Sequence, residues 1–154
     1  MAKAIEYPHA ECSSKPASPK TSTGATTAHR TATWVIHAPR GAMPANGDAA
    51  QALGSKWSVL QMARELDDAI LHMRTNEPDL GVWVIKTQGD AQAVMAMDAF
   101  LAAHAQHWFV RQTLGLLRRT LSRLDVSSRS LVALVEEGSC FTGTYLELAL
   151  ACDR

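Results

Sequence analysis

The residues best suited to chemistry lie at the end of the chain, in the segment 130–154. An apolar run, 131–135, leads into a turn that contains Gly138 and Gly143, and a second apolar run with Glu147 in its first turn follows. The pattern predicts a strand, a loop of small residues and the start of a helix. Free backbone N–H groups at a helix start favour an anion. The segment therefore predicts a site for a developing oxyanion, with Glu147 beside it as an acid or base.

Two further sets of residues could do chemistry, and each has a simpler interpretation. His104 and His107 stand three positions apart near a predicted helix end, a spacing at which histidines can share a metal ion. No third ligand is apparent, so a helix-end or surface role is favoured and no metal site is predicted. Cys140 could act as a nucleophile if a histidine base lay close. A small buried cysteine is the favoured alternative.

Charged side chains near the same segment also allow two interpretations. Four arginines could contact phosphate groups, since a guanidinium forms paired hydrogen bonds with phosphate oxygens; they are Arg111, Arg118, Arg119 and Arg123. A solvated helix face is favoured for them. Glu136 and Glu137 could form a carboxylate pair, but their place at the end of a predicted strand favours a solvated turn.

The elements that must position these residues alternate between strand and helix. Apolar spacing predicts strands at 33–38, 81–87 and 131–135, and helices at 55–75, 91–105, 108–124 and from about residue 144. Ser55 and Asp90 are placed to cap two of these helices. Residues 39–54 are predicted to form a loop because of their Gly and Pro content.

This order of elements predicts an α/β fold with mostly parallel strands and packed helices. The strands at 81–87 and 131–135 should be parallel neighbours, with the helix at 55–75 packed on their sheet. Residues 1–30 are expected to be a disordered or non-native segment, because a stretch rich in Pro, Ser and Thr cannot bury enough apolar surface to fold. Residues 31–154 are expected to form the domain.

Composition narrows the class of protein. The 154 residues have room for one domain. The net charge of +0 gives no electrostatic case for binding nucleic acid or an anionic membrane surface. No apolar run is long enough to span a membrane, and the N-terminus lacks the apolar core of a signal peptide, so a cytoplasmic location is expected. The three cysteines lack C-x-x-C spacing and indicate neither a disulfide framework nor a zinc ribbon.

The C-terminal segment resembles the enoyl-CoA hydratase/isomerase (crotonase) family. The family pattern is a strand, a turn glycine, a Gly-Gly-Gly-x-Glu-Leu-Ala helix start and an Ala-x-Asp end. In this chain 131–135 matches the strand, Gly138 the turn glycine, 143–149 the helix start and 151–153 the end. The resemblance implies a partial crotonase-like fold in which Glu147 is the first catalytic glutamate.

The same resemblance implies two backbone oxyanion donors. One is the N–H group of Thr144, in the helix start. The other is the N–H group of Met97, since the family's Gly-Ala-Asp stretch after the preceding strand corresponds here to residues 96–98. Gly143 and Ala96 would then lie against the substrate. In a working site the Thr144 amide should point, unpaired, toward Met97 or Ala96.

Longer stretches narrow the resemblance to the family of benzoyl-CoA-dihydrodiol lyases, also called 2,3-epoxybenzoyl-CoA dihydrolases. The second crotonase-like half of that family is similar to residues 64–99, 107–131 and 133–154, within a match that covers roughly 31–154. The resemblance implies a CoA-thioester lyase or hydrolase of aerobic benzoate degradation. The substrate would be 2,3-epoxybenzoyl-CoA, and no cofactor is implied beyond the CoA that the substrate carries.

Family proteins are longer than this chain, so the resemblance also implies partners and truncation. The partners would be an acyl-CoA thioester, the remainder of a longer polypeptide and, at full length, further copies of it; no nucleic acid or membrane is implied. Residues 31–154 would be a truncated domain, inactive alone, that leaves apolar surface exposed around Leu146, Leu148 and Leu150.

Three departures from the crotonase pattern leave an alternative open. Thr144 and Tyr145 replace two of the family glycines, and Tyr145 adds bulk where a thioester would approach. Met97 stands where a small residue is usual. The family's second carboxylate would fall beyond Arg154. The alternative is a catalytically silent crotonase-like half with a structural or assembly role. A small binding domain unrelated to the family is disfavoured by the length of the match.

Overall fold

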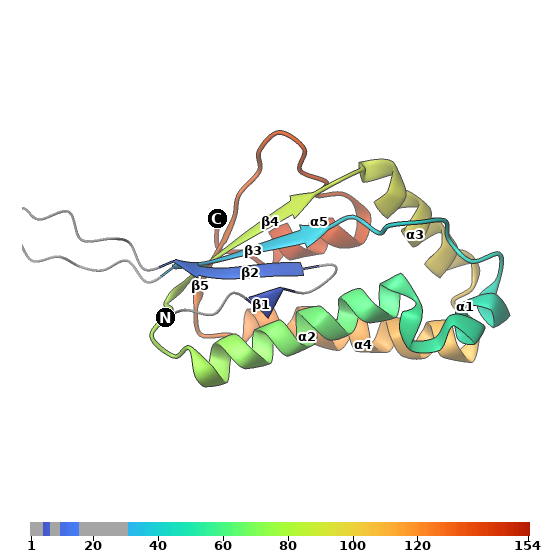
Figure 1. The fold of residues 1–154 in the computed structure, drawn as a ribbon, viewed down its shortest axis with the longest axis horizontal. Helices are drawn as coiled ribbons and strands as arrows, with labels where there is room; N and C mark the ends of the chain where they lie inside the picture. The colour runs from blue at the N-terminus through green and yellow to red at the C-terminus, as the bar shows by residue number, and fades with distance from the viewer. Residues whose placement is uncertain (1–4, 7–9, 16–30) are drawn as a thin grey trace, which may run out of the picture.

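The computed structural model describes residues 5–6, 10–15 and 31–154, with side chains from residue 31 onward (Figure 1). Its sheet has the strand order β1-β2-β3-β4-β5. The strands are β1 (Ile5–Glu6), β2 (Ala10–Lys15), β3 (Thr31–His37), β4 (Val82–Gln88) and β5 (Ser130–Ala133). The three strands β3, β4 and β5 are parallel, and β2 pairs antiparallel with β1 and β3.

The parallel part of the sheet confirms the predicted α/β fold. Thr33 lies opposite Val84, which in turn lies opposite Val132. Strands β4 and β5 are therefore parallel neighbours, as the sequence predicts. Strands β1 and β2 lie within residues 1–30, the segment expected to be disordered or non-native, and they pair in the sheet. The rest of that segment lies outside the described residues.

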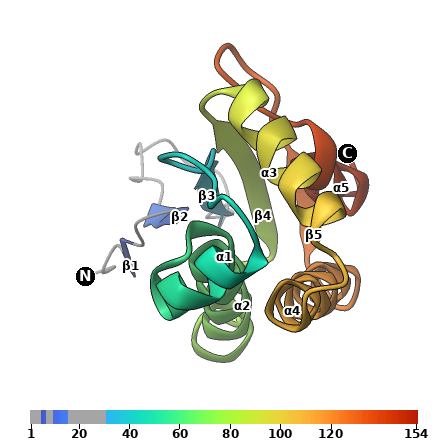
Figure 2. The ribbon, with the colours of Figure 1, turned by 90° about the vertical axis from the view of Figure 1, so that its right-hand side faces the viewer.

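Five α-helices accompany the sheet in the described part of the chain. They are α1 (Gly47–Leu53), α2 (Ser58–Asn76), α3 (Ala91–Ala103), α4 (Trp108–Asp125) and α5 (Gly143–Leu150). Figure 2 shows α2 and α4 together below the sheet and α3 beside α5. Helices α2 and α4 contact each other along their length, while α5 contacts α3, β4 and β5. The architecture is compatible with a partial crotonase-like fold.

Helix α1 and the start of α2 correct the sequence prediction. Helix α1 lies within the stretch 39–54, which was predicted to be loop. Its N-cap is Asn46, whose side-chain oxygen accepts a hydrogen bond from the Ala49 amide at 2.9 Å. Ser55 does not cap α2, because it lies in a 3-10 turn and the helix begins after Trp57. Trp57 is fully buried against Phe100 and Phe109, so packing fixes this helix start.

The core lies between the sheet and the helices. The rings of Trp34 and Trp83 stack at its centre with their centroids 4.9 Å apart. The buried face of α2 supplies Val59, Met62, Ala63, Leu66, Ala69, Ile70 and Met73. Helix α2 also contacts β2 of this sheet, in agreement with the predicted packing of the helix on the sheet. Asp90 caps α3 as predicted, since its carboxylate accepts from the Gln92 amide at 2.8 Å.

The segment after α5 returns to the sheet and is hydrogen-bonded to β5. The Leu131 amide donates to the Asp153 carboxylate at 2.9 Å, and the Asp153 amide donates to the Leu131 carbonyl at 2.9 Å. On this helix, Leu146 and Leu150 are exposed by 44% and 68%, as expected, but Leu148 is buried. The expectation for Leu148 is wrong because its side chain faces the core.

Candidate functional site at the start of helix α5

Helix α5 has an N-cap residue whose side chain does not cap the helix. Gly143 is the first helical residue, and Thr142 is the N-cap with an extended backbone. The Thr142 side chain makes no capping hydrogen bond to the helix. Its hydroxyl instead donates to the Met95 sulfur at 3.2 Å. The first N–H groups of α5 therefore need another acceptor.

Asp98 of α3 provides that acceptor. The Thr144 amide donates to one carboxylate oxygen of Asp98 at 2.8 Å, and the Thr144 hydroxyl donates to the other. Both oxygens of Asp98 thus bind one residue at the positive end of the helix. The expectation of an unpaired Thr144 amide is corrected, because the place expected for a substrate oxygen holds a carboxylate of the protein itself.

Gly143 is required for this contact. A Cβ atom at position 143 would lie 1.7 Å from an Asp98 carboxylate oxygen and 3.0 Å from its Cγ. The backbone also has φ of +48°, a left-handed conformation that glycine adopts without strain. Gly143 was predicted to lie against a substrate. In the structure it leaves room for the side chain of Asp98.

The second predicted donor is not placed as expected. Met97 lies in the middle of α3, where each N–H group donates to a carbonyl one turn earlier in the helix. Its side chain is fully buried. Ala96 precedes it on the exposed surface of the same helix. The structure thus corrects the expected position of this donor: the Met97 amide belongs to the helix and does not end a loop after β4.

Glu147 is exposed, one turn after Thr144, and lines a groove between α4 and α5. The groove has a volume of about 680 Å³, and its apolar wall includes Leu117, Leu121 and Leu150. A carboxylate in such an open position can exchange protons with water or with a ligand in the groove. Its predicted role as an acid or base remains a prediction.

Tyr145 does not obstruct the helix start, because its ring points into the core. The ring is 1% exposed, and the hydroxyl donates to the His37 carbonyl at 2.8 Å. Burial raises the pKa of the Tyr145 hydroxyl above its usual 10.0. The first turn of α5 is therefore fixed on one side by Asp98 and on the other by the end of β3.

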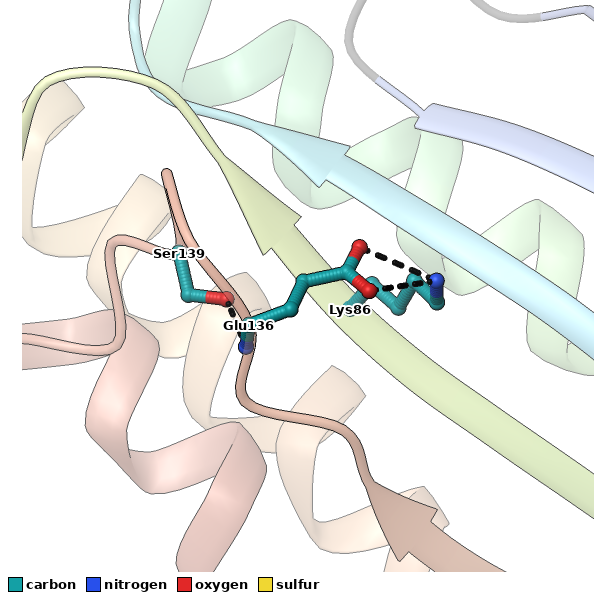
Figure 3. Close-up of polar contacts among 3 residues, drawn as sticks. All are labelled: Lys86, Glu136 and Ser139. Carbon is teal, nitrogen blue, oxygen red and sulfur yellow. Dashed lines mark hydrogen bonds and ion pairs between the residues drawn. The ribbon is translucent and has the colours of Figure 1, made fainter.

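A second polar cluster, which the sequence did not predict, lies where β4 and β5 end. Figure 3 shows Lys86 and Glu136 facing each other, with Lys86 Nζ 2.9 and 3.0 Å from the two carboxylate oxygens. The Glu136 amide donates to Ser139 Oγ at 3.0 Å, and the Ser139 amide donates to the Glu136 carbonyl. The exposed turn favoured for Glu136 is confirmed, with Lys86 rather than Glu137 as the partner of its carboxylate.

The two cysteines within residues 31–154 sit in different surroundings. Cys140 is 1% exposed, and burial raises its thiol pKa, so the small buried cysteine is confirmed. Its amide donates to the Thr87 hydroxyl at 2.9 Å. Burial and the nearby Asp153 charge raise the pKa of Cys152 to about 11. Both thiols are poor nucleophiles at neutral pH.

The histidine pair takes on packing and surface roles. His107 Nε2 lies 3.1 Å from the Asp48 carboxylate, and the His104 ring packs against Phe100. Within residues 31–154, no group of three or more His, Cys, Asp or Glu side chains could hold a metal ion. None of the helices that the structure describes has the length and apolar character to cross a membrane.

The arginines of α4 are mostly solvated, as favoured. Arg123 forms an ion pair with Asp67 of α2, with a distance of 3.0 Å between the guanidinium and carboxylate. The other three are exposed: Arg111, Arg118 and Arg119. Arg123 thus ties α4 to α2.

Comparison with known proteins identifies the relationship. No family model matches the chain. The chain is 57% identical over 125 residues to a benzoyl-CoA-dihydrodiol lyase of Aromatoleum evansii. The match covers 81% of this chain and 22% of the relative, so the chain spans about a fifth of the length of that curated relative. The chain is therefore a homologue of a segment of benzoyl-CoA-dihydrodiol lyase, which confirms the family resemblance seen in its sequence.

Proposed function

We propose that this chain is part of a CoA-thioester lyase that acts on 2,3-epoxybenzoyl-CoA in aerobic benzoate degradation. The observation that carries the proposal is the 57% identity over 125 residues to a benzoyl-CoA-dihydrodiol lyase. In this proposal the remainder of a longer polypeptide accompanies the chain, and the whole protein assembles into an oligomer in the cytoplasm. CoA enters as part of the substrate, and no separate cofactor takes part.

One version of this function places the chemistry at α5. Glu147 would transfer a proton, and the Thr144 and Met97 amides would bind the thioester oxygen. Gly143 and Ala96 would lie against the substrate. This version requires two rearrangements: Asp98 must leave the Thr144 amide, and α3 must unwind at Met97 to free its N–H group. A neutral thioester oxygen is a weaker acceptor than the carboxylate that it would displace.

The second version gives this segment a supporting role within the lyase, and the geometry favours it. The Thr144 donor is occupied by Asp98, and the Met97 donor lies within a helix. Glu147 lies in an open groove, where water screens its charge. In this role α5 and its contacts shape the domain, and the oxyanion chemistry is carried elsewhere in the lyase.

Turnover of the lyase polypeptide that contains this segment tests both statements. The variant Glu147→Gln removes the carboxylate and keeps the size of the side chain. Glu137→Gln makes the same change in an exposed loop and is the matched control. The supporting role predicts that both variants retain turnover within about twofold. A loss of about a hundredfold in Glu147→Gln alone would place acid-base catalysis at this residue. A wild-type protein that does not convert the epoxidised thioester would overturn the lyase proposal.

A further inference from the structure

We propose that Asp98 is a cap supplied from α3 that locks the start of α5 and keeps its N–H donor closed to external anions. This inference concerns the start of α5, and only its consequence for catalysis rests on the proposed function. The contact between Asp98 and Thr144 is present in this chain whatever reaction the lyase catalyses. It joins residues that are 46 positions apart in the sequence.

Asp98 takes the place of the N-cap side chain of α5. An N-cap side chain normally accepts a hydrogen bond from the second or third amide of its own helix. Thr142 occupies that position and makes no such bond. The Asp98 carboxylate accepts the bond instead, from the amide of Thr144 at 2.8 Å. Helix α5 therefore obtains its cap from α3.

The residues around the Asp98 carboxylate leave room for it and bind it. Gly143 has no Cβ, and any Cβ there would collide with the Asp98 oxygen that binds the Thr144 amide. The Thr144 hydroxyl holds the other oxygen. The Thr142 hydroxyl also contacts α3, because it donates to the sulfur of Met95. Gly143 thus leaves room for one carboxylate that the protein itself provides, and Thr144 binds both of its oxygens.

The consequence is a closed donor. An anion or polarised carbonyl that approached Thr144 would have to displace a carboxylate held by two hydrogen bonds and by the positive end of the helix. Asp98 is in this sense a positioning residue, which acts through Thr144 and the placement of α5. Removal of its side chain should open the donor without changing the donor itself.

Amide hydrogen exchange of the isotope-labelled chain tests the lock. Replacement of a charge-assisted bond by water should make the Thr144 amide exchange about ten- to a hundredfold faster in Asp98→Ala than in the wild type. Asp98→Asn, which keeps one acceptor oxygen, should give a smaller increase. Asp125→Ala removes an exposed carboxylate at the end of α4 and should leave the exchange of Thr144 unchanged.

Added formate provides the specific readout, since it can occupy the space that Asp98→Ala vacates. Formate should slow Thr144 exchange in Asp98→Ala in a saturable way and have no effect on the wild type. Unchanged Thr144 exchange in a folded Asp98→Ala, or saturable formate binding at Thr144 of the wild type, would overturn the proposal. If Asp98→Ala does not fold, Asp98→Asn decides: faster local exchange supports the lock, and wild-type exchange overturns it. Neither result depends on lyase activity, so failure of the lock and failure of the proposed function are distinguishable.

Discussion

Tyr145 connects the start of α5 to the end of β3 through one hydrogen bond. Its hydroxyl donates to the His37 carbonyl at 2.8 Å from within the core. Burial raises the pKa of this hydroxyl above 10.0, so the folded chain holds the proton more tightly than the unfolded chain does. The resulting stabilisation is fully present below pH 10.0 and is lost as the pH rises toward the folded-state pKa.

The pH dependence of unfolding should therefore change when this hydroxyl is removed. Tyr145→Phe should lower the free energy of unfolding by about 1 kcal/mol at pH 8, because one buried hydrogen bond is lost. Above pH 10 the wild type should lose stability more steeply than Tyr145→Phe. Urea unfolding of both proteins between pH 8 and pH 11 measures the difference. Parallel pH profiles would contradict the assignment of the slope to Tyr145.

At the scale of elements, α1 shows how a short helix depends on its cap. It has seven residues, begins at the Asn46 cap and packs on α4. Asp48 of α1 lies 3.1 Å from His107, and the Trp108 indole N–H donates to Gln51 at 3.1 Å. Gly47 lies so close to the His107 ring that a Cβ there would be 2.5 Å from the ring. The helix is thus held by its cap and by one end of α4.

Loss of this cap should destabilise the domain measurably. Asn46→Ala removes the acceptor for the Ala49 amide and should lower the free energy of unfolding by about 1 kcal/mol. Asn46→Asp keeps an acceptor oxygen at the same position, now on a carboxylate, and is the matched control. Thermal or urea unfolding compares the three proteins. Equal stability of Asn46→Ala and the wild type would show that packing on α4 alone holds α1.

The sequence predicted most elements because their signals are local. The capped start of α3 and the apolar face of α2 can be read from neighbouring residues. Helix α1 was missed because Gly and Pro residues surround its short alanine-rich core. The occupied donor at α5 could not be predicted, because Asp98 and Thr144 are 46 positions apart and meet only when α3 packs on α5. The family resemblance placed Thr144 at the start of this helix, but tertiary structure determines what its N–H group binds.

At the scale of the whole molecule, stability should depend on the core between the sheet and α2. Trp83→Ala removes a fully buried ring that stacks on Trp34, and it should lower the free energy of unfolding by about 3–5 kcal/mol. Leu150→Ala, at a position exposed by 68%, should change it by less than about 0.5 kcal/mol. Urea unfolding measures both. Similar losses for the two variants would show that Leu150 is buried in solution, in an assembly or against another surface.

Sequence patterns predict one part of the sheet and miss another. The parallel order of β3, β4 and β5 follows from strands that alternate with helices, and this part was predicted. The antiparallel pairing of β2 with β3 was not, because Ala10–Lys15 is short and polar and its pairing depends on the edge that β3 offers. From the identity to a lyase segment and the occupied Thr144 donor, we propose that this chain supports a thioester lyase without itself binding the thioester oxygen.

A titration of the isotope-labelled chain with benzoyl-CoA, a thioester that lacks the reactive epoxide, tests this claim most directly. We expect the Thr144 amide resonance of the wild type not to shift, even at millimolar thioester, because the Asp98 carboxylate occupies the donor. In Asp98→Ala the same amide is free to respond. A saturable shift of the Thr144 amide in the wild type, accompanied by a shift at Glu147, would overturn the proposed supporting role and place a working oxyanion site in this domain.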